Sequence, residues 1–218
     1  VSYNGTTDTV LSGLSDGTGY VLAMFAYDSY GNVATSSEVT FTTLRLPIAT
    51  TFSTSTGSTD FTQVEDITAV AEMVLATSTP EGATTQVEWA GTVDAEGEDY
   101  ASHVIMGDGF VSINAAVLDP TIDSPASITM TGINCENYLI YYASGFYTTK
   151  SDIVSGGQLC NGATTPACSD MACTAGTLTF SVPHFDGFGI GQDNSQQENA
   201  SPTGGGAGSF LQQQRTAN

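Results

Sequence analysis

The chain has 218 residues, with 23 Asp and Glu against only 3 Lys and Arg, and its formal net charge is -20. Nucleic acid is not an expected partner, because binding it needs several Lys or Arg side chains that displace phosphate counterions. No apolar run approaches the roughly 18 residues of a membrane span. Since 40% of the residues are apolar and 12% charged, composition predicts a folded, secreted or surface-exposed β protein with a hydroxyl-rich exterior.

Residues 1–44 are predicted to be β. Thr9–Leu14 is a short strand, Tyr20–Tyr27 and Val33–Thr43 alternate in the manner of paired strands, and the sequence DSYGN at 28–32 is a turn between them. Three strands leave one apolar face uncovered, and segments near 40 residues seldom fold unaided. We therefore expect something outside this segment to complete it.

The same segment carries a family signature in LSDGTGY at 14–20, Ala26, DSYGN at 28–32 and SSEVTFTT at 36–43. It resembles the C-terminal half of a fibronectin type III domain. The resemblance implies that Tyr20 forms a tyrosine corner, with its hydroxyl bonded back to the backbone. It also implies that four strands are missing. The upstream part of the precursor, the second domain or a strand from a neighbouring copy would replace them.

Three further segments follow. Residues 45–62 are expected to be a Thr/Ser-rich linker, residues 63–191 the main domain, and residues 192–218 a Gln/Gly-rich tail. Short strands separated by turn signals predict an all-β protein whose main domain is an antiparallel, immunoglobulin-like sandwich. The strands are expected at Glu72–Thr77, Thr85–Trp89, His103–Met106, Phe110–Leu118, Ala126–Ile133, Tyr138–Tyr147 and Thr177–Val182. Val64–Leu75 also has helical spacing, and for its second half we favour the strand.

The main domain has its own signature in TDF at 59–61, VEDI at 64–67, VEW at 87–89, HVIMGDGFVSI at 103–113, ASITM at 126–130 and TLTFSVPHF at 177–185. It resembles a β domain found near the C-termini of archaeal and related microbial cell-surface proteins. The resemblance implies an extracellular location and a mechanical or modular role. Within it, we expect Trp89 and His184 to be structural.

Four cysteines, Cys135, Cys160, Cys168 and Cys173, lie in the last third of the main domain. An even number in an extracellular context predicts two disulfides. Three pairings are open, and we favour Cys168–Cys173 with Cys135–Cys160. A zinc site is the alternative, but the chain has only two His and the cysteine spacing is poor for zinc ligands.

The acidic run Asp94, Glu96, Glu98 and Asp99 could hold calcium, which prefers several carboxylate and carbonyl oxygens. The alternative is a solvated loop, because the spacing is not that of an EF-hand. Calcium is the only cofactor that the sequence suggests. Asn4 and Asn199 begin glycosylation sequons, so attached glycans are a further expectation.

No nucleophile elbow, HExxH motif or phosphate-binding loop is present, and His184 beside Phe185 is typical of a packed residue. A carboxylate pair of the kind that glycosidases use stays open, with no reason to choose a pair. The aromatic run from Tyr138 to Tyr147 could stack sugars. Alternation would place Tyr138 and Tyr142 on one face of a strand, with Tyr141 and Tyr147 on the other.

These observations predict a non-catalytic extracellular structural protein, a subunit of a surface layer, sheath or filament assembled through β-strand sharing. Its expected partners are other copies of itself or the upstream part of its own precursor. The alternative function is a carbohydrate-binding or adhesive module of a larger secreted protein. In either case, we expect no membrane insertion in this segment.

Overall fold

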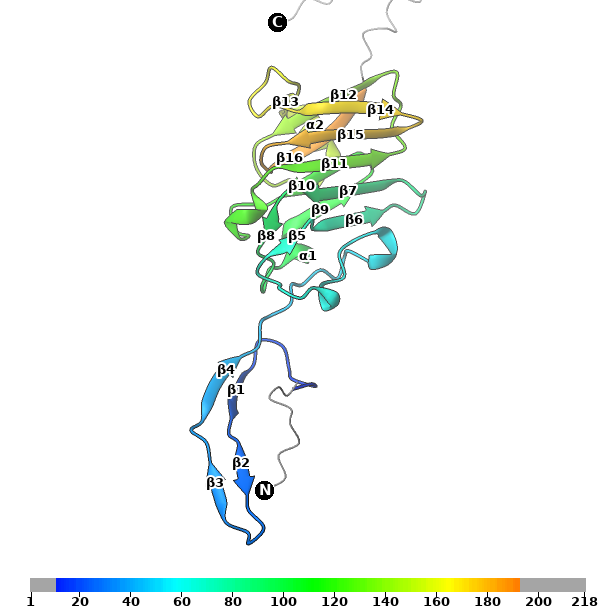
Figure 1. Cartoon of the computed structure of the whole chain (residues 1–218). Coiled ribbons are helices and arrows are strands. Elements are labelled where there is room, and N and C mark those ends of the chain that lie inside the picture. The colour runs from blue at the N-terminus through cyan, green and yellow to red at the C-terminus, as the bar shows by residue number, and fades with distance from the viewer. Residues whose placement is uncertain (1–10, 193–218) are drawn as a thin grey trace, which may run out of the picture.

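A computed structural model of the chain describes residues 11–192. Residues 45–192 form a β-sandwich, and residues 11–44 form a slender two-stranded arm that projects from one end of it (Figure 1). The prediction of an all-β sandwich is therefore confirmed. Among the described residues, no helix combines the length and apolar character needed to cross a membrane.

One sheet of the sandwich consists of five antiparallel strands, and the side chains of its three central strands alternate between core and solvent. In spatial order the five strands are β14 (Ser169–Thr174), β15 (Thr177–Val182), β11 (Ala126–Thr131), β7 (Thr84–Trp89) and β6 (Val74–Ser78). Ile128 in the central strand lies opposite both Val87 and Phe180. This period of two is what the sequence offers there, and it buries one face of the sheet.

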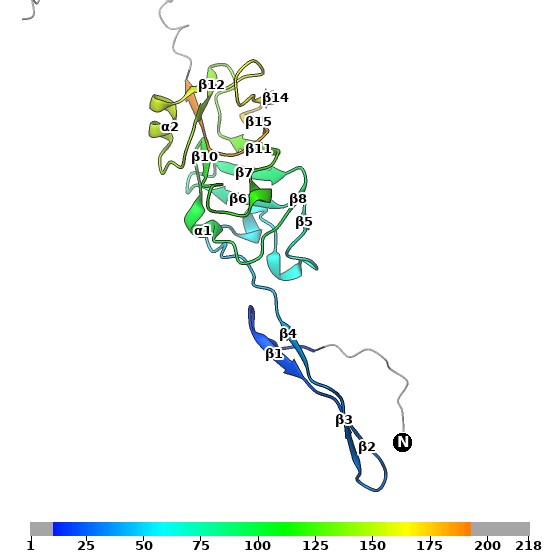
Figure 2. The same cartoon turned by 90° about the vertical axis from the view of Figure 1, so that its left-hand side faces the viewer.

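The second sheet also has five antiparallel strands. In spatial order they are β13 (Gln158–Leu159), β12 (Tyr138–Ala143), β16 (Gly187–Gln192), β10 (Phe110–Ile113) and β9 (Val104–Gly107). The two sheets pack face to face (Figure 2). Their inner faces meet in one core, in which Trp89, Phe180 and Phe188 are fully buried.

The helix α2 (Lys150–Gly156) lies on the outer face of the second sheet, against β16 and β12. Glycine makes this possible. A Cβ added at Gly189 would lie 3.1 Å from Cγ2 of Ile153, and a Cβ at Gly187 would lie 3.2 Å from Cγ1 of the same side chain. The glycines of β16 therefore point outward and admit Ile153, which is completely buried, while the intervening Phe188 enters the core.

The second half of Val64–Leu75 is extended, as we favoured, because β5 (Val70–Ala71) pairs with β8 (Thr92–Val93) and β6 begins at Val74. Other elements differ from expectation. The strands predicted to reach Leu118 and Tyr147 end at Ile113 and Ala143. The sequence reading missed β13, β14, β16 and α2. The remaining helices are short: η1 (Thr54–Thr56), η2 (Phe61–Gln63), η3 (Pro120–Ile122) and α1 (Tyr100–His103).

Residues 45–62, which we expected to be a linker, lie against the sandwich. Phe61 is buried, Phe52 is half-buried against the core, and Phe61 stacks on Tyr100 with ring centroids 6.0 Å apart. Two aromatic side chains spaced through a Thr/Ser-rich stretch thus attach the segment to the domain.

Candidate functional site

The arm, residues 11–44, is a single hairpin in two short ladders. β1 (Gly19–Leu22) pairs with β4 (Val39–Thr42), and β2 (Phe25–Tyr27) pairs with β3 (Val33–Thr35). Between the ladders, Met24 and Ser36 keep the strands together, because the Ser36 N–H donates to the Met24 carbonyl at 2.9 Å. Of the segment predicted as a strand at Thr9–Leu14, residues 11–14 are not in a strand, and 9–10 lie outside the described residues.

One face of the arm is apolar and uncovered. The register places Tyr20 opposite Phe41 and Leu22 opposite Val39, so these four side chains share one face. The Tyr20 and Phe41 rings stack with centroids 5.7 Å apart, and Val39 is 56% exposed. We call this set the arm face. Val21, 61% exposed, points to the opposite side.

The tip of the arm is equally open. Phe25, Tyr27 and Val33 are more than half exposed. The turn after them is held by Asp28, whose carboxylate accepts hydrogen bonds from the Tyr30 and Asn32 N–H groups and from the Asn32 amide. The Asn32 side-chain amide is the main cause that lowers the pKa of Asp28. The turn is therefore well formed, although no other element of the described chain covers the strands beside it.

At the base of the arm, Tyr20 bonds back to the chain that precedes it. Its hydroxyl accepts a hydrogen bond from the Ser15 N–H at 2.6 Å, and the Thr43 hydroxyl donates to the Ser15 carbonyl at 2.6 Å. The Leu46 N–H donates to the Asp16 carboxylate at 2.9 Å. These bonds tie residues 15 and 16 to the base of the hairpin and to Leu46, where the chain leaves the arm.

The arm connects to the sandwich through residues 45–48. The Ile48 N–H donates to the Glu98 carbonyl at 2.7 Å, and the Ala101 N–H donates to the Ile48 carbonyl at 2.9 Å, as in a short parallel bridge. The Gly97 N–H donates to the Arg45 carbonyl at 2.9 Å. The acidic loop that we considered for calcium is therefore the docking site of the arm.

The four acids of that loop have separate structural roles. The Asp94 carboxylate accepts a hydrogen bond from the Glu96 N–H, and the Glu96 carboxylate accepts one from the Arg45 N–H. The Asp99 carboxylate caps α1 by accepting a hydrogen bond from the Ser102 N–H. Glu98 is half-buried, and desolvation raises its pKa above the ordinary 4.5. Within residues 11–192, no group of three or more His, Cys, Asp or Glu side chains is arranged to hold a metal ion.

The sandwich, in contrast to the arm, protects its outermost strand β6. The Ser58 hydroxyl donates to the Ala76 carbonyl at 3.0 Å and accepts from the Ala76 N–H at 2.9 Å. The Thr59 N–H donates to the Val74 carbonyl, and the Thr59 hydroxyl accepts from the Val74 N–H, both at 2.9 Å. The backbone groups that an incoming strand would need are therefore already bonded.

The other three edge strands also carry features that oppose strand addition. β14 contains an irregularity between Ser169 and Ala172, with Asp170 in the left-handed region at φ 51°. β13 has only two residues. β9 has only four residues, and its Val104 N–H is bonded within α1. Compared with these four edges, the strands of the arm are left without such protection.

Two disulfides are present, but our favoured pairing was wrong. Cys135 bonds to Cys173 and Cys160 to Cys168, with Cα atoms 5.4 and 5.5 Å apart. Cys168 and Cys173 cannot pair because β14 is extended between them. Five residues of strand span about 16 Å, far beyond disulfide reach. All four cysteines are bonded, so the zinc alternative is also wrong.

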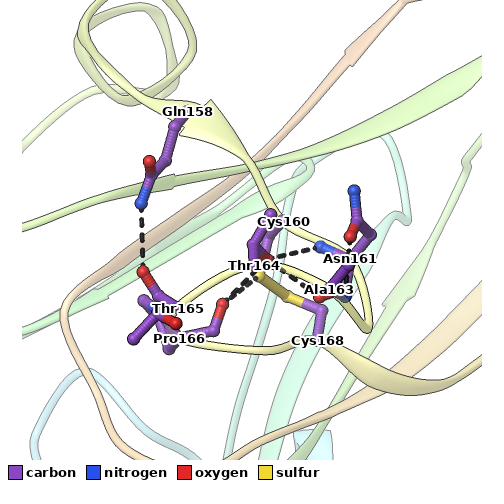
Figure 3. The surroundings of a disulfide bond; sticks show 8 residues. All are labelled: Gln158, Cys160, Asn161, Ala163, Thr164, Thr165, Pro166 and Cys168. Atoms are coloured by element: carbon purple, nitrogen blue, oxygen red, sulfur yellow. Dashed lines mark hydrogen bonds between the residues drawn. A yellow bond between two sulfur atoms is a disulfide. The ribbon is translucent and has the colours of Figure 1, made fainter.

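The Cys160–Cys168 bridge closes a small loop, which its own polar groups hold in shape (Figure 3). The Gln158 amide donates to the Thr165 carbonyl at 3.1 Å, and the Ala163 N–H donates to the Asn161 side chain at 2.9 Å. Two disulfides indicate a non-reducing environment of the extracellular kind.

Trp89 lies in the core, whereas His184 lies at its margin. Trp89 is fully buried, donates from Nε1 to the Ile122 carbonyl at 2.9 Å and packs on Phe185. His184 is half-buried and meets the edge of the Tyr142 ring. Tyr142 itself is only 9% exposed, so its ring cannot stack a sugar.

Tyr141 and Tyr147 lie on the outer face of the second sheet, against Gly191 and Gly187, as alternation predicted. Asn4 and Asn199, the sequon residues, lie outside the described residues. The sequence reading missed the roles of Ser58 and Thr59 at the β6 edge. The TGSTD sequence before an apolar strand was the available signal.

Comparison of the chain with protein families, curated proteins and solved structures finds no match. The functional argument therefore depends on the geometry of the chain itself.

Proposed function

We propose that this protein is a non-catalytic extracellular structural subunit of a surface layer, sheath or filament, and that copies join through the arm. The uncovered arm face is the observation that carries the proposal. An isolated two-stranded hairpin is at best marginally stable in water, and a third strand or a packed layer is needed for stability. The arm face, with Tyr20, Leu22, Val39 and Phe41, offers such a layer its contact.

The protected edges of the sandwich support the same proposal. If every sheet edge were open, association would be unspecific. Here, the strand-sharing surface is confined to residues 11–44, while Ser58 and Thr59 seal β6. Strand addition by a second copy would supply main-chain hydrogen bonds, and the arm face would supply the apolar contact.

The charge adds a condition. Copies that each carry -20 repel one another. Screening shortens this repulsion from a range of about 10 Å at 0.1 M salt to about 3 Å at 1 M. Assembly through the arm is therefore expected to strengthen as salt rises, since its attraction is apolar and its opposition electrostatic.

The test is light scattering of the purified chain against concentration at 0.1 and 1 M NaCl. We expect assembly that strengthens with salt. The double substitution Leu22→Thr/Val39→Thr, which keeps strand propensity, should weaken association by about tenfold or more, because it removes apolar surface from the contact. Val21→Thr on the opposite face is the matched control and should assemble like the parent.

A chain that stays monomeric at both salt concentrations, while hydrogen exchange shows the arm protected, would contradict the proposal. In that case, the layer that covers the arm face would come from the same polypeptide and not from a second copy. Equal effects of the control and the double variant would show that the arm face is not the contact.

A further inference from the structure

A groove of about 480 Å³ opens at the end of the second sheet where β10 and β12 finish and β16 begins. This volume is within the usual range for ligand sites. The groove is far along the chain from the arm and does not depend on the proposed function. The residues of its lining that matter here are Asn114, Asp123, Phe146, His184 and Asp186.

Hydrogen bonds between the connecting segments, and from one of them to β12, hold the floor of the groove. The Asp186 carboxylate accepts from the Tyr142 hydroxyl and from the Gly145 N–H at 2.9 Å. Asp123 accepts the Phe185 N–H at 2.7 Å through Oδ1. Desolvation and the bond to Asp186 raise the pKa of Tyr142 to about 12, so its hydroxyl stays a donor at neutral pH. The site is therefore preformed.

Other polar groups in the groove are uncommitted. Among the hydrogen bonds of the described residues, none engages the Asn114 side-chain amide, the His184 ring nitrogens or Oδ2 of Asp123. Asn114 and His184 are half-buried. Phe146 and Ala115, also half-buried, add apolar surface beside them. A few polar groups that converge beside apolar ones are the usual composition of a ligand site.

From this combination we infer that the groove binds a segment of neutral oligosaccharide. Asn114 provides both donors and an acceptor, His184 one of each, and Asp123 a free acceptor, which together match adjacent sugar hydroxyls. Phe146 offers apolar surface to the C–H face of a sugar ring. The two carboxylates repel phosphates and other anions. A cationic peptide is disfavoured because Asp186 is already engaged by two donors.

The test is a fluorescence-polarisation titration of the folded chain with labelled cellohexaose, maltohexaose and mannohexaose, and with a labelled oligolysine peptide. We expect at least one hexasaccharide to bind. Asp123→Asn keeps an acceptor for the Phe185 N–H, and we expect it to weaken hexasaccharide binding by about tenfold, as loss of a charged hydrogen-bond partner does. Phe146→Ala should weaken it by several-fold or more. Asp170→Asn on β14 is the matched control and should change nothing.

Absence of binding to all three hexasaccharides up to millimolar concentration would overturn the inference. Unchanged binding in both groove variants would also overturn it. Oligolysine binding that Asp123→Asn abolishes, without hexasaccharide binding, would reassign the groove to cations. Near-ultraviolet circular dichroism shows whether each variant keeps its fold. Shortening of the hexasaccharides during incubation would contradict the non-catalytic part of the proposed function and leave the arm untouched.

Discussion

The contact between β16 and α2 predicts that an alanine at Gly189 lowers the free energy of unfolding, whereas the same substitution in an uncrowded strand would raise it. Replacing Gly by Ala in a strand ordinarily stabilises a protein by about 0.5–1 kcal/mol, because Ala loses less conformational freedom on folding. At Gly189, the added Cβ would lie 3.1 Å from Cγ2 and 3.3 Å from Cβ of Ile153. Overpacking of this kind costs about 1–3 kcal/mol. We therefore expect Gly189→Ala to destabilise the chain by about 1–2 kcal/mol.

The assay is urea unfolding followed through the fluorescence of Trp89, the single tryptophan and a fully buried one. Gly91→Ala is the control, because its added Cβ would meet nothing within 4 Å. Ile153→Ala alone should cost about 2–5 kcal/mol. In the Ile153→Ala background, Gly189→Ala should change the free energy of unfolding little or not at all. The double-mutant cycle then gives an interaction energy of about 1–2 kcal/mol between positions 189 and 153.

An unchanged or raised unfolding midpoint for Gly189→Ala would refute the reasoning. So would an equal cost of Gly189→Ala with and without the Ile153 side chain. The result also concerns the groove, because α2 follows directly on the loop that carries Gly145 and Phe146. A displaced helix should therefore weaken hexasaccharide binding as well.

Two further predictions concern the disulfides and the docking loop. Loop-closure entropy predicts that removing a disulfide lowers the free energy of unfolding by more when the bridge spans a longer segment. Replacing Cys135 and Cys173, which are 38 residues apart, by Ser should cost about 4 kcal/mol, and replacing Cys160 and Cys168, which are 8 apart, about 2.5 kcal/mol. Equal urea midpoints of the two variants would contradict this order. Folding raises the pKa of Glu98 above the ordinary 4.5. The protonated side chain therefore contributes its full stabilisation below pH 4.5, and this stabilisation is lost as the pH rises through the pKa that Glu98 has in the folded state. Glu98→Gln should therefore be more stable than the parent at pH 7 and flatten the pH profile of the urea midpoint; a steeper profile would count against it.

The sequence was a good guide wherever alternation was complete. β7, β11 and β15 place every second side chain in the core, and their predicted positions were correct to within two residues at each end. The strand β16 was not predicted, because its outward positions are Gly187, Gly189 and Gly191, and glycines at this spacing are typical of a flexible segment. Their purpose is visible only when α2 lies against them.

Other misses had local signals. α2 begins at a Thr149 cap whose hydroxyl bonds Asp152, a spacing typical of helix starts. The cysteine pairing depended on recognising Ser169–Thr174 as a strand, which its sequence SDMACT, without alternation of apolar and polar residues, did not indicate. The groove could not be predicted, because Asn114 and Asp123 come from the β10–β11 connection and His184 from the β15–β16 connection, which only the topology brings together.

The attachment of the arm has a mechanical consequence. Force applied to the tip would reach the sandwich through residues 45–48, whose backbone bonds to Gly97, Glu98 and Ala101 are loaded together. A parallel bridge pulled along its length resists in shear, with its bonds sharing the load, whereas a hairpin pulled open at its ends unzips one bond at a time. A pull on the tip runs along the extended strands and does not separate the two ends of the hairpin, so the arm and its anchorage would both pass the load on to the disulfide-bonded domain behind them.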